Sequence, residues 1–146
     1  MAEDGATLRD LQRLSDELFA QCFPQAGDSQ VVGSESLVIQ EIEAGHAELG
    51  YRLFRNNSGA FKDATGRLVR FGLGNRSARS CKRMKSSDFI GFRIVDGKPI
   101  FASIECKKKG WTKPINEHER AQARWLHAVN LAGGIGRFVT CLEDLR

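Results

Sequence analysis

Two extended runs at residues 87–95 and 98–107 flank the dipeptide Asp96–Gly97. An Asp-Gly pair between alternating apolar runs is the strongest local signal for a two-residue β-hairpin turn. When these two residues form the centre of the turn, counting outward along both strands pairs Asp88 with Glu105. The sequence therefore predicts a hairpin that carries two opposed carboxylates.

The predicted pairing brings a set of groups with related chemistry to one face of the hairpin. Directly opposed residues have Cβ atoms roughly 5 Å apart, so two carboxylates placed there repel each other. A divalent cation converts this repulsion into binding, because Mg²⁺ is typically held by one or two carboxylates with water and phosphate. The strand period of two puts Lys107 on the same face as Ser103 and Glu105, and the backbone carbonyl of Cys106 is a candidate further ligand. This combination suits phosphodiester hydrolysis.

Two considerations weigh against this interpretation. Pro99 cannot donate a hydrogen bond to the ladder, and a bulge there would shift the register. Asp88 and Glu105 also fit solvent-facing strand residues, with Lys107 as an ordinary surface charge. The pairing alone therefore leaves a structural explanation open beside the catalytic one.

The length of 146 residues suits a single domain with its own hydrophobic core. Hydrophobic residues make up 41% and charged residues 27%, which are values of a globular chain rather than of a disordered or membrane protein. Residues 1–5 are acidic and lack the features of a secretory signal, so we expect an intracellular, cytoplasmic protein with no membrane partner. The four cysteines are scattered without zinc-site spacing, and we expect free thiols.

The charge is distributed unevenly along the chain. Residues 1–50 carry two Arg against ten Asp and Glu, a net charge of −8. The overall net charge is +4, so the other 96 residues carry a net charge of +12. From Arg67 to Lys85 there are seven basic residues and no acidic one. Such a field favours a polyanionic partner, although a basic run taken alone is more often solvated surface.

Capping residues and apolar periods outline the remaining elements. Thr7 can cap a helix with leucines at helical spacing, which is predicted to pack against the core. Ser34 can cap a second helix headed by Glu35, and a third helix is expected to open at Asn116 and stop at Gly133–Gly134. Further strands are predicted at residues 51–55, 67–73 and 135–140, and a loop that orders on its ligand is predicted at 74–86. The order predicts an α/β fold with a central mixed sheet flanked by helices.

Several segments together resemble a known nuclease family. The sequence SSDFIG at 86–91, followed by ECK at 105–107, resembles the split D…ExK motif of the PD-(D/E)XK nuclease superfamily. More narrowly, the chain resembles the VRR-NUC (virus-type replication-repair nuclease) family through RNNSGAF at 55–61, VRFG at 69–72, AGG at 132–134 and EDL at 143–145. The match begins near Ser34, which divides the chain into an N-terminal helical extension at 1–30 and a nuclease domain at 34–146. It implies a restriction-endonuclease-like core.

The resemblance implies a role for each residue of the motif. Asp88 and Glu105 are implied as metal ligands and Lys107 as the catalytic lysine. Glu35 matches the acidic residue on the family's first core helix, which helps complete the metal site; the alternative is a helix-start glutamate favoured by the macrodipole. Gln122 matches a glutamine that supports the site from the helix after the ExK strand; the alternative is an ordinary surface residue.

One position departs from the superfamily pattern, and several others are candidates for DNA contact. The proline that precedes the aspartate in the superfamily is Ser87 here, a change that leaves the metal chemistry intact. Trp111 either stacks on a base or covers the sheet edge, and the three histidines lack ligand spacing and are interpreted as structural or exposed. The predicted DNA-binding residues are Arg55, Asn56, Asn57, Arg70, Arg76, Arg79, Lys82, Arg83, Lys108 and Lys109.

The main functional hypothesis is a DNA endonuclease that uses Mg²⁺ or Mn²⁺, with the resemblance implying phage or bacterial replication, recombination or repair. Stand-alone members of this kind resemble Holliday-junction resolvases. Two coordinated cuts in branched DNA imply a homodimer. One alternative is a non-catalytic DNA-binding module with salt-sensitive binding and no cleavage. Another is a restriction-type endonuclease, although the short chain shows no separate recognition domain.

Overall fold

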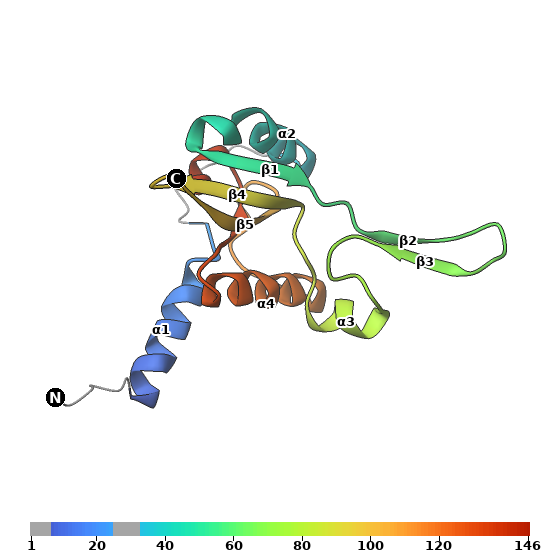
Figure 1. Cartoon of the computed structure of the whole chain (residues 1–146), viewed down its shortest axis with the longest axis horizontal. Helices are drawn as coiled ribbons and strands as arrows, with labels where there is room; N and C mark the ends of the chain where they lie inside the picture. The colour runs from blue at the N-terminus through green and yellow to red at the C-terminus, as the bar shows by residue number, and fades with distance from the viewer. Residues whose placement is uncertain (1–6, 25–32) are drawn as a thin grey trace.

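The computed structural model describes residues 7–24 and 33–146, and it contains a four-stranded sheet with helices on both faces (Figure 1). The elements follow the chain as α1 (Leu8–Ala20), α2 (Glu35–Gly45), η1 (His46–Leu49), β1 (Tyr51–Arg55), β2 (Gly59–Lys62), β3 (Leu68–Phe71), α3 (Ala78–Arg83), β4 (Phe89–Val95), β5 (Lys98–Cys106), α4 (Glu117–Leu131), β6 (Ile135–Val139) and η2 (Leu142–Leu145). The sheet order is β1-β4-β5-β6. Only β5 and β6 run parallel, so the sheet is mixed, as predicted.

The β4–β5 hairpin has the predicted register. Val95 pairs with Lys98 and Phe89 with Ile104. Asp96 and Gly97 both have positive φ, +50° and +74°, which is the geometry of a type I′ turn. Pro99 pairs with Ile94 without shifting the register.

One face of the sheet is covered by α2, which Ser34 caps through a hydrogen bond from the Leu37 N–H. Val38 and Ile42 of α2 are fully buried in the core on this side. The other members of this core come from β1, β4, β5, β6 and the C-terminal turn: Tyr51, Leu53, Phe89, Ala102, Ile104, Cys106, Val139 and Leu145. This packing fixes the strands whose ends carry the predicted site.

The opposite face is covered by α4, which Asn116 caps through the Glu119 N–H (Figure 1). The buried residues of α4 are Ala121, Gln122, Ala123, Leu126, Val129 and Asn130. A second core lies here, and its members are Cys22, Trp111, Ala123, Leu126 and Phe138. The ring of Trp111 contacts that of Phe138 in a tilted arrangement, with ring centroids 4.5 Å apart, so Trp111 packs against β6, which agrees with its interpretation as a cover for the sheet edge.

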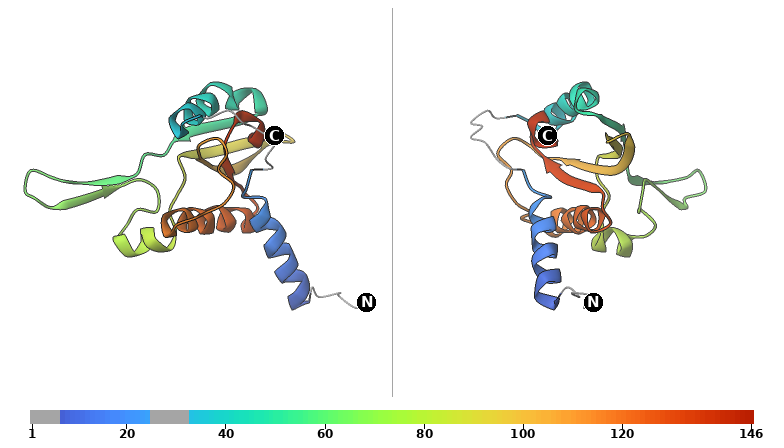
Figure 2. Two further views of the ribbon diagram at one scale, coloured as in Figure 1. Left: turned by 180° about the vertical axis from the view of Figure 1, so that it is seen from behind. Right: turned by 60° about the vertical axis from the view of Figure 1, so that its left-hand side comes forward.

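The helix α1 differs from its prediction. Thr7 caps it with a capping box through Asp10, as the sequence indicated. Leu8, Leu11 and Leu14, however, are 86%, 52% and 51% exposed, and no residue of α1 is buried. The helix projects from the body with its N-terminal end farthest away, so its apolar face is not used in the core of this chain (Figures 1 and 2).

The C-terminal end of α1 is nevertheless attached to the body. Asn130 of α4 donates a hydrogen bond to the Leu18 carbonyl at 3.3 Å, and Ser15 lies 3.1 Å from Nε2 of His127. Past the helix, the Phe138 N–H donates to the Cys22 carbonyl at 2.6 Å. The chain therefore runs beside β6 immediately after α1.

Two elements between β1 and β4 were not predicted in this form. The strand β2 pairs with β3 in a separate two-stranded hairpin that extends away from the sheet (Figures 1 and 2). Residues 74–86 contain the short helix α3, so the prediction of an unstructured loop is wrong. Ser77 caps α3 in a capping box with Ser80, which supplies local order without any apolar period.

Across the described ranges, none of the helices combines the length and the apolar character needed to cross a membrane. All four cysteines are free, as predicted. Cys22 and Cys106 are buried, and burial raises the pKa of the Cys22 thiol to about 11. These two thiols are therefore poor nucleophiles.

Candidate active site

The predicted site residues meet at the open end of the β4–β5 hairpin, opposite its turn. Asp88 directly precedes β4, Glu105 is the second-last residue of β5, and Lys107 directly follows that strand. Gln122 reaches the same place from α4. These residues line one cleft of about 610 Å³, together with Glu35 at the start of α2.

The side chains of Asp88 and Glu105 each accept a hydrogen bond from a backbone N–H of the opposite strand end. The Asp88 N–H donates to Oε2 of Glu105 at 3.2 Å, and the Cys106 N–H donates to Oδ2 of Asp88 at 3.0 Å. The predicted opposition of the two carboxylates is thus realised through reciprocal backbone contacts. In the part of the chain that the structure describes, Oδ1 of Asp88 accepts no hydrogen bond, which leaves it available as a ligand.

Lys107 is held between two partners in the floor of the cleft. Its Nζ lies 2.9 Å from Oε1 of Glu105 and 2.9 Å from Oε1 of Gln122. Nε2 of Gln122 donates to the same Glu105 oxygen. All three side chains are at least nine-tenths buried, so the ammonium is fixed by hydrogen bonds rather than by solvent.

The electrostatics of the site point to an excess of negative charge. Burial and, to a smaller extent, the nearby Asp88 raise the pKa of Glu105 to about 7, while Lys107 acts in the opposite direction. The carboxylate of Glu35 adds a smaller repulsion. A cation placed among these groups would relieve that repulsion.

A second layer of hydrogen bonds fixes the strand ends. The Ser103 hydroxyl donates to Oγ of Ser87 at 2.8 Å, and Nε1 of Trp125 donates to Oγ of Ser103 at 2.8 Å. Ser87 therefore connects the start of β4 to β5 and, through Ser103, to α4. Its small polar side chain has a defined partner at this buried position.

Two of the predicted ligands are less closely engaged. Glu35 is exposed and lines the cleft, but within the described ranges no three His, Cys, Asp or Glu side chains converge as a metal-binding group. As the first residue of α2, Glu35 keeps its carboxylate solvated at the rim. The Cys106 carbonyl belongs to the strand end beside Asp88, and its role as a ligand stays a prediction. The donor set at the centre is thus Asp88 and Glu105, which fits Mg²⁺ or Mn²⁺ with water and substrate oxygens completing the shell.

The asparagine-rich turn after β1 lies at the cleft, with Arg55, Asn56 and Asn57 among the lining residues. Asn56 serves as a structural residue there. Its Nδ2 donates to the Ser87 carbonyl at 2.8 Å and to Oγ of Ser86 at 3.0 Å. The sequence predicted Asn56 as a DNA or active-site contact, with an ordinary turn residue as the alternative, and did not predict these hydrogen bonds to Ser86 and Ser87.

The predicted basic residues do not converge on one point. Arg70 and Lys82 line a second cavity next to the cleft. Arg76 and Arg79 are exposed around α3, and Arg83 borders a smaller cavity near Trp125. Lys108 is exposed, whereas the Lys109 N–H donates to the Gly33 carbonyl. The positive charge is therefore spread along the hairpin, α3 and the segment after β5.

Sequence reasoning missed two residues of the cleft, His118 and Lys85. Nζ of Lys85 lies 3.2 Å from Nε2 of His118, and both residues line the cleft. Partial burial lowers the pKa of His118, and the positive charges of Lys85 and Lys107 lower it further. His118 stands four positions before Gln122 in the helix that Asn116 opens, so helical spacing could have placed it on the same side.

Comparison of the chain with protein-family models, with curated proteins and with solved structures found no match.

Proposed function

We propose that the protein is a divalent-metal-dependent deoxyribonuclease of the VRR-NUC type, with a PD-(D/E)XK core. The observation that carries the proposal is the joint engagement of Glu105 by Lys107 and Gln122, beside the opposed carboxylate of Asp88. The three residues of the resemblance motif and a helix residue outside it share one hydrogen-bond network. Glu105, Lys107 and Gln122 are at least nine-tenths buried, as a coincidental set of solvent-facing groups would not be.

Each of these residues has a distinct chemical task. Asp88 and Glu105 would hold Mg²⁺ or Mn²⁺. When bound, the ion would lower the pKa of its water ligand and neutralise charge on the phosphate. The ammonium of Lys107 orients the attacking water or balances the charge that develops on the phosphate. Gln122 holds that ammonium in place through its amide oxygen, 2.9 Å away. Because the side chains are already in contact, little reorganisation is needed when the substrate arrives.

The surroundings of the cleft support a nucleic-acid substrate. Arg55 and Lys85 line it, and the basic hairpin and α3 continue from its edge. The net charge of the chain after residue 50 is strongly positive, which favours a polyanion over a small acidic metabolite. We further propose branched DNA as the substrate and a homodimer as the active form, since paired cuts need two sites.

A cleavage assay with several DNA structures tests this function. Labelled four-way junction, flap, duplex and single-stranded DNA are incubated with Mg²⁺, Mn²⁺ or EDTA and with the wild type, Glu105→Ala or Lys107→Ala. The exposed residue Glu48, which lies outside the cleft, provides a matched control as Glu48→Ala. The proposal expects metal-dependent cutting that both site variants abolish and the control retains.

The same assay separates the main alternatives. Binding to DNA with no cutting in any metal would replace the proposal with a non-catalytic DNA-binding module. Cutting confined to one short sequence in plain duplex would identify a restriction-type endonuclease instead.

A further inference from the structure

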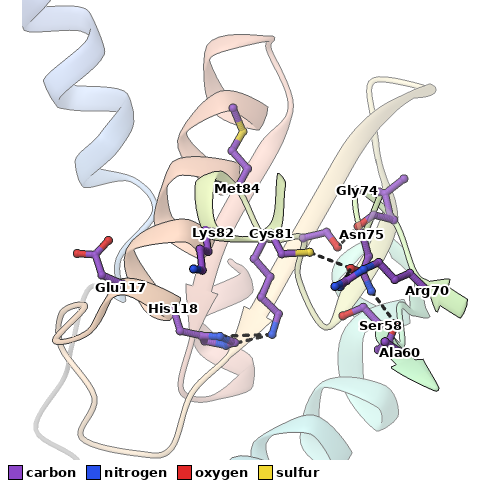
Figure 3. Close-up of a pocket in the computed structure, with 14 residues that line it drawn as sticks. Ser58, Ala60, Arg70, Gly74, Asn75, Cys81, Lys82, Met84, Glu117 and His118 are labelled. Atoms are coloured by element: carbon purple, nitrogen blue, oxygen red, sulfur yellow. Dashed lines mark hydrogen bonds between the residues drawn. The ribbon is translucent and has the colours of Figure 1, made fainter. Parts of the chain in front are cut away.

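A second cavity, of about 630 Å³, lies beside the active-site cleft, between the β2–β3 hairpin, α3 and the start of α4 (Figure 3). Four residues line both hollows: Ser58, Lys85, Ser86 and His118. The two hollows are therefore adjacent, and a strand with a phosphate in the cleft would have a neighbouring nucleotide near the second cavity.

The two hollows differ in chemistry. The cleft is walled by carboxylates, amides and ammonium groups around Glu105 and Lys107. The second cavity has apolar walls from the side chains of Ala60, Leu73 and Met84. A phosphate gains nothing from such walls, whereas a nucleobase has two large faces that do.

Cationic groups stand at the second cavity without strong acidic partners. Arg70 and Lys82 line it, and Arg70 contacts only the Asn75 amide, at 3.3 Å, among the described residues. Glu117 also lines it, but its carboxylate is paired with Arg120 at 2.6 Å. The cavity thus combines apolar walls with free positive charge, as a nucleotide requires.

The walls of the cavity are joined by hydrogen bonds that form before any ligand binds. Nδ2 of Asn75 donates to the Gly59 carbonyl at 2.7 Å and to the Phe71 carbonyl at 2.8 Å. Its Oδ1 accepts from Sγ of Cys81 at 2.8 Å, which links the hairpin to α3 (Figure 3). Asn75 therefore uses its polar atoms within the protein, and the apolar walls of the cavity provide the surface on which a base can stack.

We propose that this cavity receives one unpaired nucleobase of the DNA strand whose phosphate occupies the active-site cleft. The proposal rests on the nuclease function and makes its substrate class more specific: DNA with an unpaired nucleotide, such as a bulge, flap or branch point. A base that is already unpaired enters without the cost of unpairing, which gives selectivity against intact duplex. Stacking on apolar walls tolerates any base, so the selection should depend mainly on whether the base is unpaired.

Binding measurements in EDTA test the proposal without cleavage. Three duplexes are compared: one with a single bulged 2-aminopurine, one with an abasic nucleotide at the same position, and one fully paired. The proteins are the wild type, Ala60→Phe and Ala64→Phe. Ala60 lines the cavity, whereas Ala64 is an exposed residue in the turn of the same hairpin and gives a matched control.

The wild type is expected to bind the bulged base about tenfold more tightly than the abasic duplex, with a change in 2-aminopurine fluorescence. Ala60→Phe fills the cavity and should remove both effects, while Ala64→Phe should keep them. Equal binding of the bulged and abasic duplexes by the wild type would overturn the proposal, because only the backbone would then be recognised. Equal behaviour of the two phenylalanine variants would overturn it as well.

Hydrolysis of bis(p-nitrophenyl) phosphate by the wild type with Mn²⁺ separates this proposal from the nuclease function, because that substrate has no nucleobase. Hydrolysis without a preference for the bulged base would support the nuclease and overturn the cavity proposal. A preference for the bulged base without any phosphodiester hydrolysis would support the cavity and overturn the nuclease.

Discussion

Nζ of Lys107 lies 2.9 Å from Oε1 of Gln122, a residue on the helix that covers the opposite side of the cleft from α2. The strand alone does not fix this lysine. Its ammonium has two partners, one on β5 and one on α4, so the position of α4 determines where the charge sits. The position of the proposed catalytic lysine therefore depends on the packing of α4 against the sheet.

Loss of the amide at Gln122 should reduce turnover without abolishing it. In Gln122→Ala, Lys107 keeps Glu105 but loses its second partner, and kcat is expected to fall about 10- to 100-fold. KM for DNA should stay within about twofold of the wild type, because Gln122 contributes to positioning rather than to DNA affinity. Steady-state kinetics with the exposed Gln40→Ala as control check this. An unchanged kcat would show that Lys107 needs no support from α4.

The burial of Glu105 predicts a dependence of stability on pH. Its pKa rises from 4.5 to about 7 on folding, so between these values the folded protein holds a proton that the unfolded chain has lost. In the metal-free protein, this group should make the free energy of unfolding fall as pH rises from about 4.5 to about 7, and level off above. Urea unfolding from pH 4.5 to 8 measures this, and Glu105→Gln should remove that part of the dependence. An identical pH profile for the two proteins would contradict it.

Metal should offset the destabilisation at high pH. A ligand at 100 times its Kd stabilises the native state by about 2.7 kcal/mol. Mg²⁺ or Mn²⁺ should therefore raise the unfolding midpoint at pH 8, and the rise should shrink toward pH 6 as Glu105 takes up its proton. The Asp88→Asn variant should show a smaller rise than wild type at pH 8. Equal stabilisation of both proteins would place the metal elsewhere.

The local signals in the sequence predicted much of the core. The Asp96–Gly97 turn fixed the register of the hairpin, and the caps at Ser34 and Asn116 located the two helices that sandwich the sheet. These signals depend on nearest neighbours in the chain, so they are readable without a tertiary structure. They also brought Asp88 and Glu105 to the same place.

Other features could not be predicted because tertiary contacts or solvent decide them. The spacing of the leucines in α1 indicates that one face of the helix is apolar, but it does not indicate what covers that face. In the structure the face is exposed. The strand β2 has little strand-forming character and extends into solvent with β3. His118 gave no signal as a single residue, since its place in the cleft depends on where α4 packs.

The basic stretch around α3 predicts a salt-dependent contribution to DNA binding. Arg79 and Arg83 are exposed and lie outside the active-site cleft, so the double alanine variant should weaken binding without affecting the metal site. Each phosphate contact that is lost should reduce the slope of log K against log salt by about 0.9. Fluorescence anisotropy measures the DNA affinity of both proteins at salt concentrations from about 50 to about 200 mM, a range in which counterion release changes affinity strongly. Unchanged binding by the variant would refute the assignment.

The contact between α4 and β6 predicts a strong effect at Gly136. A Cβ at this position would meet the backbone of Leu126, and neither backbone can move without shifting α4. Gly136→Ala is expected to destabilise the protein by about 1–3 kcal/mol, as overpacking does. It should also lower cleavage, because α4 carries Gln122.

Substitution at Gly66 provides the comparison for this effect. Its φ is +81° and nothing lies within 4 Å of an added Cβ, so Gly66→Ala tests backbone strain alone. It should cost about 1 kcal/mol and leave cleavage unchanged. Equal loss of activity in the two variants would argue against the dependence of the site on α4.

The most direct test of the central claim is the rate of DNA cleavage against Mg²⁺ concentration for the wild type, Asp88→Asn and Asp96→Asn. The two substitutions remove the same charge at opposite ends of one hairpin, and only Asp88 faces Glu105. Metal-dependent cleavage is expected in the wild type and in Asp96→Asn, with a loss of at least about 100-fold in Asp88→Asn. Cleavage by Asp88→Asn at the wild-type rate, or cleavage that persists in EDTA, would contradict it.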